Sequence, residues 1–189
     1  MKLHTVSTEN SVILIIDPQE KLLPKVFEPE RVTNNCKLLI KFARIMGLPL
    51  ILTTQYEKGI GPIVQEIGKE IPGTSTIDKV EFGCFNNPEF VRHVEQMEKS
   101  RNTLIVSGIE SHICVTQTAL GAMERGYNVH VASDAVSSRT EWNWKAGLDR
   151  MREAGATISS TEMIIFEILK RSDSAEFQEM LPDLRHSVT

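Results

Sequence analysis

Three side chains that can take part in catalysis follow short apolar runs of the sequence. Asp17 comes after "VILII", Lys79 ends "STIDK", and Cys114 lies just past "TLIVSG". A thiol can attack a carbonyl carbon, and a carboxylate within hydrogen-bond reach can take the thiol proton and later activate water. An ammonium group beside them would stabilise both anions. These residue types predict covalent catalysis by a cysteine, provided that the fold brings them to one place.

Cys114 stands where the sequence predicts the first turn of a helix, ahead of "VTQTALGAMERG". There a thiol faces unpaired backbone N–H groups and the positive end of the helix dipole, which lower its pKa from about 8.5 towards neutrality or below. This position favours a reactive thiolate. Taken singly, each residue also has a plain interpretation, because a cysteine beside an apolar run is commonly an inert core thiol, and an aspartate or lysine after a strand is commonly a turn or surface residue.

Short β-rich runs alternate with helical patterns along the whole chain. Most of the runs are continuous and apolar, which is typical of strands buried on both faces of a parallel sheet. The predicted strands cover residues 11–17, 48–54, 75–79, 103–108, 128–133 and 156–160. This order predicts a single α/β domain over residues 1–189, a three-layer doubly wound sheet of about six mainly parallel strands with helices on both faces. Ligands bind outside the carboxyl ends of such strands, so the three side chains are expected at one edge of the sheet.

The composition limits the classes of partner. The chain has 189 residues, 41% of them hydrophobic, and a formal net charge of −4, so it can bury a core but offers no basic footprint for nucleic acid. The first apolar run is too short for a secretory signal or for a membrane span, which needs about 20 apolar residues. The three cysteines are odd in number and lack zinc-site spacing. We therefore expect a cytoplasmic protein with reduced thiols and neither a membrane nor a nucleic-acid partner.

Three longer segments resemble the signature segments of one family. They are "VILIIDPQ", "DKVEFGCF" and "VSGIESHICVTQTALGAMERGYNVHVASDAVSSR". In this order they resemble the isochorismatase-like cysteine hydrolases, whose fold is a Rossmann-like α/β sheet. The stretch "ILTTQYEKGIGP" resembles the isochorismatase domain-containing branch in particular. The similarity extends from about residue 11 to about residue 170.

The resemblance implies a role for each residue that matches the family's motifs. Asp17 matches the general base, Lys79 the lysine of the catalytic triad, and Cys114 the nucleophile. A non-proline cis peptide before the nucleophile's helix would fall between Ile109 and Glu110. The backbone N–H groups of Glu110 and Cys114 would form the oxyanion hole.

The stretch "TTQYEKGIG" departs from the pattern of the nicotinamidases, amidases of this fold with an Asp-x-His pair and a further His as metal ligands. Because it contains neither Asp nor His, we expect no metal and no other cofactor, and nicotinamide is not the expected substrate. Gln55 and Tyr56 stand there instead and could offer an amide and a phenol to a substrate, or simply pack at a strand end. Gln19, Phe82 and His112 are further candidate substrate-binding residues, and His112 could equally cap the helix.

The resulting prediction is a metal-independent cysteine hydrolase that acts on a small-molecule substrate with an amide or related C–N bond, through a thioester on Cys114. One alternative is hydrolysis of a vinyl ether, with Asp17 as acid and no thioester. Another is a non-catalytic binding or redox-sensing protein with a vestigial triad. Trp142 and Trp144 lie two residues apart and therefore face different directions on a helix, which together with the resemblance indicates a homo-oligomer, a dimer or larger.

Overall fold

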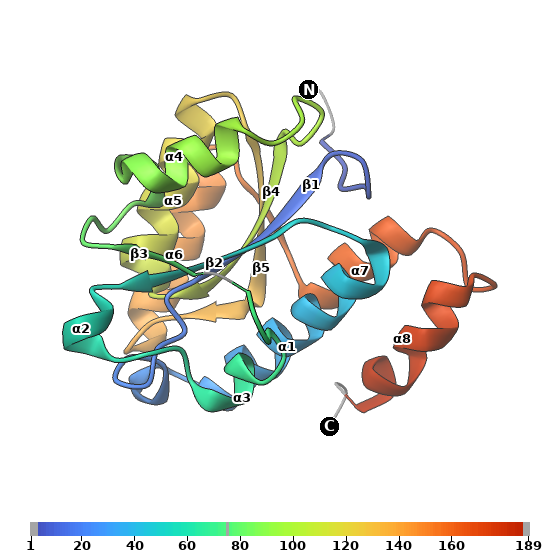
Figure 1. Ribbon diagram of the computed structural model, residues 1–189, viewed down its shortest axis with the longest axis horizontal. Helices are drawn as coiled ribbons and strands as arrows, with labels where there is room; N and C mark the ends of the chain where they lie inside the picture. Colours follow the sequence, from blue (N-terminus) through green and yellow to red (C-terminus); the bar gives the residue numbers. More distant parts are fainter. Residues whose placement is uncertain (1–3, 75, 187–189) are drawn as a thin grey trace.

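A six-stranded parallel sheet forms the middle layer of the protein (Figure 1), in a computed structural model that describes residues 4–74 and 76–186. The spatial order of the strands is β3-β2-β1-β4-β5-β6, and each neighbouring pair is parallel. This confirms the predicted doubly wound sheet. The strands are β1 (Ser11–Ile16), β2 (Leu50–Gln55), β3 (Thr76–Lys79), β4 (Thr103–Ile109), β5 (Asn128–Ser137) and β6 (Thr157–Ser159). Ser75, where the third strand was expected to begin, lies outside the described residues.

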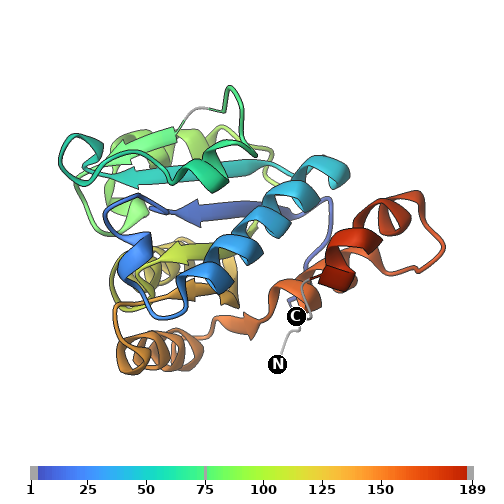
Figure 2. The ribbon, with the colours of Figure 1, turned by 90° about the horizontal axis from the view of Figure 1, so that it is seen from below.

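Helices cover both faces of the sheet (Figures 1 and 2). One face carries α1 (Pro29–Met46), α3 (Gln65–Gly68), α7 (Thr161–Leu169) and α8 (Ala175–His186). The other carries α4 (Pro88–Glu95), α5 (Thr116–Glu124) and α6 (Glu141–Glu153). The short helix α2 (Glu57–Ile60) follows β2, and 3₁₀ turns span Leu23–Lys25 and Cys84–Asn86. Among the described residues, no helix is long and apolar enough to cross a membrane.

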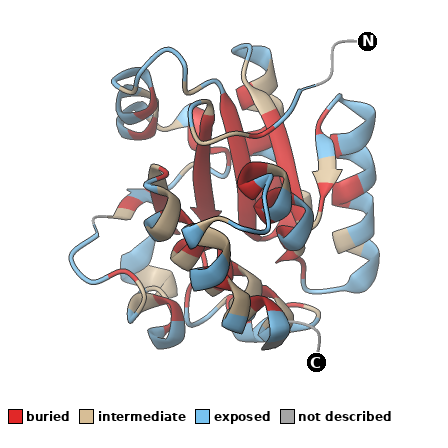
Figure 3. Ribbon diagram, turned by 90° about the vertical axis from the view of Figure 1, so that its right-hand side faces the viewer, coloured by how far each residue is buried: buried red, intermediate tan, exposed pale blue. Residues whose placement is uncertain are grey.

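The central strands are buried on both faces. In β1, Ile13 and Ile15 belong to the core beneath α1, whereas Val12, Leu14 and Ile16 belong to the core beneath α4, α5 and α6. Every residue of β1 and of β4 is buried, as the red strands of Figure 3 show. The continuous apolar runs of the sequence therefore reflect two cores, one on each side of the sheet.

β5 runs to Ser137, beyond its predicted end at residue 133. Its pairing with β4 shifts register, because Val106 pairs with Val131 while Gly108 pairs with Val136. The intervening residues of β5 bulge out of the ladder before pairing resumes. Consequently β5 reaches as far as the carboxyl end of β4 and places the loop that follows it beside the turn that follows β4.

Bonds from two helices satisfy the polar groups of this bulge. Arg31 of α1 donates from Nη1 to the carbonyl oxygen of Asp134 at 2.5 Å. The Asp134 carboxylate accepts from the backbone N–H and the hydroxyl of Thr161, the first residue of α7, at 2.8 and 2.9 Å. The predicted strand ends before Asp134, but here the Asp134 carboxylate bonds to the start of α7 and the strand continues to Ser137.

The C-terminal helix α8 lies outside the elements predicted from the sequence. Met180 and Leu184 are buried in the core that α1 covers. Lys41 of α1 pairs with Asp183 at 2.6 Å. Pro182 lies inside α8, where proline disfavours helix. The packing of α8 on α1 therefore stabilises this helix, rather than the helix propensity of its residues.

Candidate active site

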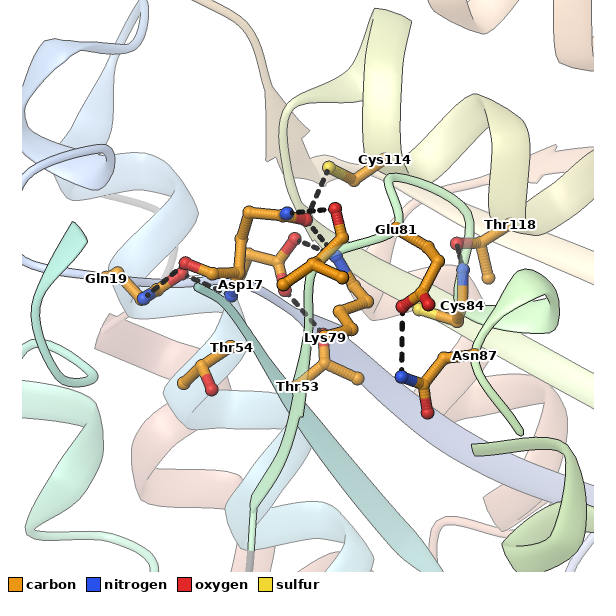
Figure 4. Close-up of polar contacts among 12 residues, drawn as sticks. Asp17, Gln19, Thr53, Thr54, Lys79, Glu81, Cys84, Asn87, Cys114 and Thr118 are labelled. Atoms are coloured by element: carbon orange, nitrogen blue, oxygen red, sulfur yellow. Dashed lines mark hydrogen bonds and ion pairs between the residues drawn. The ribbon is translucent and has the colours of Figure 1, made fainter. Parts of the chain in front are cut away.

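The candidate site lies at the carboxyl ends of the central strands (Figure 4). The chain begins at β1, builds β2 and β3 on one side, and then returns to place β4 on the other side of β1. Such a reversal of strand order leaves a crevice at the strand ends, where doubly wound proteins bind ligands. Asp17 follows β1, Lys79 ends β3, and Cys114 lies in a π-helical turn, Ser111–Val115, between β4 and α5. The structure brings these three predicted residues together.

Asp17 and Lys79 form a fully buried ion pair. Lys79 donates from Nζ to Oδ2 of Asp17 at 2.6 Å, and neither side chain is exposed to solvent. Thr53 of β2 donates from its hydroxyl to Oδ1 of Asp17 at 2.7 Å. Asp17 has a backbone φ of 51°, in the left-handed region that aspartate tolerates better than most residues. The chain thus turns immediately after β1 while the carboxylate is held by β2 and β3.

Gln55 joins the lysine to the cysteine. Its Oε1 accepts from Lys79 Nζ at 2.7 Å and from Cys114 Sγ at 3.9 Å. Its Nε2 donates to the carbonyl oxygen of Val80 at 2.9 Å, which fixes the orientation of the amide. Gln19 accepts at Oε1 from the Gln55 backbone N–H at 2.7 Å. Two of the predicted substrate-binding residues, Gln19 and Gln55, therefore belong to the polar network around the triad.

The ion pair changes the proton affinity of both its members. Burial raises the pKa of Asp17 above its usual value, although the charge of Lys79 opposes this change. For Lys79, burial acts to lower the pKa, but the charge of Asp17 opposes it and the net direction is upward. The lysine therefore stays charged while the carboxylate gains affinity for a proton, which suits a base that must take a proton from a thiol.

Burial, followed by the charge of Asp17, raises the pKa of Cys114 to about 12. The prediction that the helix N-terminus lowers this pKa is therefore wrong. Cys114 is only 7% exposed, so the loss of hydration outweighs the favourable N–H groups of the helix. The thiol is therefore neutral at pH 7.

Cys84 also approaches the site. It is fully buried, and its backbone N–H donates to the Thr118 hydroxyl at 3.0 Å. Burial raises its pKa to about 12, and the charges of Lys79 and Asp17 act on it in opposite directions. Its thiol therefore resembles that of Cys114 in protonation but is more completely enclosed.

The turn that carries Cys114 packs closely against its neighbours. The peptide bond between Ile109 and Glu110, just before the turn, is cis. Gly108 has a φ of 100°, and a Cβ at this position would collide with the backbone of Ile16. On α6, a Cβ on Gly147 would lie 2.5 Å from Ser111 Oγ. Only glycine fits these two positions, so β1 and α6 enclose the turn from two sides.

The side chains of Glu110 and His112 bond to the loop after β5. Glu110 accepts at Oε2 from the backbone N–H of Arg139 at 2.9 Å and from its Nε at 3.1 Å. His112 Nδ1 lies 2.9 Å from Ser138 Oγ. His112, predicted to bind substrate or to cap the helix, is thus bonded to Ser138.

Tyr56 and Phe82, the remaining predicted substrate-binding residues, are exposed at the ends of β2 and β3. The ring of Tyr56 lies over Gly59 of α2, where a Cβ would collide with it. Val80 is exposed as well. The structure places these side chains outside the bonded network of the triad and on the surface next to it.

Three contributors to the site were not predicted from the sequence. Thr53 holds Asp17, and Arg139 and Ser138 hold the turn before and around Cys114. A hydroxyl in the otherwise apolar run "LILTT" is a usable signal for Thr53, because a buried hydroxyl needs a partner. Arg139 and Ser138, the partners of Glu110 and His112, have no comparable signal in the sequence around them.

No set of three or more His, Cys, Asp or Glu side chains able to hold a metal occurs within residues 4–74 and 76–186. Where the nicotinamidase pattern would require ligands, Gln55 bonds to the ammonium group of Lys79. A positive charge already occupies the neighbourhood of Asp17. That the protein works without a metal remains a prediction.

Solved structures share this architecture. YcaC from Pseudomonas aeruginosa, described with hexane-2,5-diol and covalent acrylamide, has a TM-score of 0.90 at 28% identity, covering 100% of this chain and 96% of its own. A protein described as MAR1 ribonuclease from Caenorhabditis elegans gives 0.89 at 31% identity, covering 96% and 93%. YcaC from Escherichia coli, described as an octameric hydrolase of unknown specificity, gives 0.88 at 29%, covering 100% and 97%. The fold is therefore that of the isochorismatase-like α/β hydrolases.

The sequence comparisons agree with the structural ones. The Isochorismatase domain model matches residues 11–163. Isochorismatase domain-containing protein 2 of Danio rerio is 35% identical over 181 residues, 96% of this chain and 90% of that protein. Secreted isochorismatase effector Isc1 of Phytophthora sojae is 34% identical over 182 residues, 95% of this chain and 86% of that protein. The chain belongs to the isochorismatase family of hydrolases, as its signature segments indicated.

Proposed function

We propose that this chain is a metal-independent cysteine hydrolase that cleaves an amide or related C–N bond of a small molecule through a thioester on Cys114. The observation that carries the proposal is the single buried network of base, cation and thiol. Lys79 Nζ lies 2.6 Å from Asp17 and 2.7 Å from Gln55 Oε1, which also accepts from Cys114. Membership of a hydrolase family supports the proposal.

The first half of the reaction forms the thioester. Asp17 takes the thiol proton as the sulfur of Cys114 attacks the carbonyl carbon, which is consistent with a thiol that is neutral at rest. The N–H groups of Glu110 and Cys114 hold the oxygen that becomes negative, a contribution of about 3 kcal/mol per donor. The C–N bond then breaks, and the amine leaves with the proton that Asp17 held. Lys79 keeps its charge throughout and stabilises the carboxylate.

The second half releases the acid. Asp17 takes a proton from water, and the resulting hydroxide attacks the thioester carbonyl. The C–S bond breaks, the sulfur regains the proton from Asp17, and the carboxylic acid product departs. Asp17 therefore acts as base and acid in each half, a role that its raised pKa favours.

A panel of small amides, carbamates and ureas, with a pH profile, tests this reaction in the wild type and in Cys114→Ala. Cys114→Ala is expected to abolish turnover of every substrate found. Cys36→Ala is the matched control, because Cys36 is a buried thiol of α1 that belongs to the core on the opposite face of the sheet and bonds to the carbonyl oxygen of Ala135. Turnover retained by a folded Cys114→Ala variant would contradict the nucleophile assignment.

Hydrolysis of a vinyl ether is the second candidate, and the raised pKa of Asp17 favours it because a protonated carboxyl can act as an acid. The two reactions differ in the covalent intermediate. Mass spectrometry after rapid quenching should find an acyl group on Cys114 during amide hydrolysis and none during vinyl-ether hydrolysis. Acrylamide is a useful first probe, because a YcaC relative is described with covalent acrylamide and a thiol adds to this electrophile.

Two further readings are less well supported. The Caenorhabditis elegans relative is described as a ribonuclease, but the net charge of −4 and the buried triad of this chain do not favour a polyanionic substrate. Single-stranded RNA belongs in the substrate panel as a direct comparison. A redox sensor requires an accessible thiolate, whereas the pKa of Cys114 is raised to about 12.

We also propose that the protein is a cytoplasmic homo-oligomer. Trp142 is exposed while Trp144 stacks on Phe27 with ring centroids 5.8 Å apart, so the two face different directions, as their spacing predicted. The Escherichia coli relative is described as octameric, and the Phytophthora sojae relative as secreted. Light scattering at micromolar concentration tests the homo-oligomer, and a monomer would contradict it. Cell fractionation tests the cytoplasmic location.

A further inference from the structure

The loop after β5 is bonded at two successive residues to the turn that carries the nucleophile. The Glu110 carboxylate accepts from the backbone N–H and from Nε of Arg139, at 2.9 and 3.1 Å. Next to it, Ser138 Oγ accepts from the His112 backbone N–H at 3.3 Å and lies 2.9 Å from His112 Nδ1. The turn is therefore bonded to the loop that follows β5, a strand on the far side of β4 from the Asp17–Lys79 pair.

The environment of the Glu110 side chain is unusual for a carboxylate. This side chain is only 10% exposed, whereas its partner Arg139 is 61% exposed. A buried carboxylate is costly unless it is paired, and charge-assisted bonds to a single residue also fix its direction. Because the backbone of Glu110 directly follows β4, fixing its side chain also restricts the rotation of its peptide groups.

We propose that Glu110 and Arg139 are positioning residues that aim the oxyanion-binding N–H group of Glu110, without themselves touching the substrate. This inference rests on the proposed function, in which that N–H group stabilises a tetrahedral intermediate. Loss of the pair slows steps that place negative charge on a carbonyl oxygen. It leaves unchanged the steps in which the sulfur attacks a saturated carbon.

Two probes of Cys114 separate these kinds of step without knowledge of the natural substrate. With p-nitrophenyl acetate, the sulfur attacks the carbonyl carbon, Asp17 takes the thiol proton, p-nitrophenolate leaves and an acetyl thioester remains. With iodoacetamide, the sulfur displaces iodide from a saturated carbon and no oxyanion forms. The ratio of the two rates in one variant, measured as the initial release of p-nitrophenolate and as the carbamidomethyl mass added to Cys114, cancels changes in thiol pKa and access.

Glu110→Ala is expected to lower this ratio about tenfold or more, because misaligned catalytic groups lose rate steeply. Glu110→Gln should restore most of the ratio, because the amide oxygen can still accept both bonds from Arg139. Arg139→Ala removes one of the two bonds from an exposed position and should lower the ratio severalfold. Lys145→Ala is the matched control, because it removes the exposed pair of Lys145 with Glu141, 2.7 Å apart on α6, and should leave the ratio unchanged.

Equal ratios in the wild type and in Glu110→Ala would overturn the positioning role, even though acetylation of Cys114 would still support the cysteine mechanism. If Glu110→Ala fails to fold, an unchanged ratio in Arg139→Ala overturns it instead. Wild-type Cys114 that reacts with iodoacetamide but not with p-nitrophenyl acetate would overturn the proposed function itself, and this inference with it. Thermal melts of each variant establish that the ratios come from folded protein.

Discussion

The two halves of the sheet contribute to the site in different ways. The half formed by β1, β2 and β3 supplies charges from strand ends, and these side chains bond to one another; they are Asp17, Thr53, Gln55 and Lys79. The half formed by β4, β5 and β6 carries Cys114, the proposed nucleophile, in a π-helical turn, and the side chains around it bond to a loop. The first half determines the protonation of Asp17 and Lys79, and the second determines the position of Cys114.

This difference follows from the backbone that carries each group. β1 and β2 are hydrogen-bonded to neighbouring strands on both sides, and the edge strand β3 is bonded to β2, so the sheet itself fixes the strand ends that carry these side chains. A turn has no such ladder, and here side-chain bonds and close packing against glycine replace it. Changes in the first half should therefore alter ionisation and stability together, whereas changes in the second should alter reactivity at nearly constant ionisation.

The largest effect is expected from Lys79→Met, which leaves the buried carboxylate of Asp17 without its cation. Removing one partner of a buried pair costs about 3–5 kcal/mol in the free energy of unfolding, measurable by urea denaturation. Lys145→Met is the control, because its pair with Glu141 is exposed and should contribute about 1 kcal/mol or less. The double variant Asp17→Asn with Lys79→Met should regain part of the loss, and a double variant as unstable as the single one would argue against an unpaired charge as the cause.

An intermediate effect is expected from Gly147→Ala, which acts on the second half. The added methyl group would lie 2.5 Å from Ser111 Oγ and 2.8 Å from the Ser111 carbonyl carbon, so α6 and the turn must separate. Overpacking of this kind costs about 1–3 kcal/mol. Acetylation of Cys114 should slow, while the alkylation rate changes little.

Gly68→Ala supplies the matched comparison for this prediction. Gly68 ends α3, and a Cβ there would meet nothing within 4 Å. The free energy of unfolding of the Gly68→Ala variant should equal that of the wild type or exceed it slightly, because alanine favours helix. If Gly147→Ala and Gly68→Ala change the free energy of unfolding equally, close packing against the turn is not the reason that position 147 requires glycine.

The smallest effect is expected from Thr53→Val, which tunes the base without removing a charge. The hydroxyl bond at 2.7 Å favours the ionised form of Asp17 and so acts to lower its pKa. Its loss raises that pKa further, and because the proposed base must be deprotonated, the acid limb of the pH–rate profile moves to higher pH. The rate of acetylation of Cys114 as a function of pH measures this shift.

Thr54→Val offers a close control, because this neighbouring hydroxyl donates to Asp78 at 2.9 Å and not to Asp17. The acid limb of the pH–rate profile of Thr54→Val should coincide with that of the wild type. A shift of the limb in Thr54→Val, or a shift to lower pH in Thr53→Val, would contradict the assignment of Asp17 as the base that this limb reports.

The meeting of Asp17, Lys79 and Cys114 could be predicted from the sequence because it depends on strand order and strand ends. Apolar runs mark the strands, and the alternation with helices predicts that parallel strands present their carboxyl ends at one edge. The fold class follows from the same signals. No knowledge of side-chain packing is needed for either result.

The pKa of Cys114 could not be predicted in this way. The direction in which this pKa shifts depends on how far the thiol is exposed to solvent. That exposure depends on the contacts that Gln55 and the neighbouring elements make around the thiol. The bonds of Glu110 to Arg139 depend on the bulge that extends β5 beyond residue 133, where the predicted strand ends. Both features arise from contacts between residues far apart in the chain, for which a single sequence has no local pattern.

The position of β1 in the middle of the sheet has a consequence for the chain as it is synthesised. Residues 11–79 leave the ribosome before β4 and contain every strand of the β3-β2-β1 half, together with the Asp17–Lys79 pair. Until residues 103–109 follow, one side of β1 is an unpaired edge with apolar side chains on both faces, a template for aggregation. Docking of β4 covers this edge and, in the same step, brings Cys114 beside the Asp17–Lys79 pair.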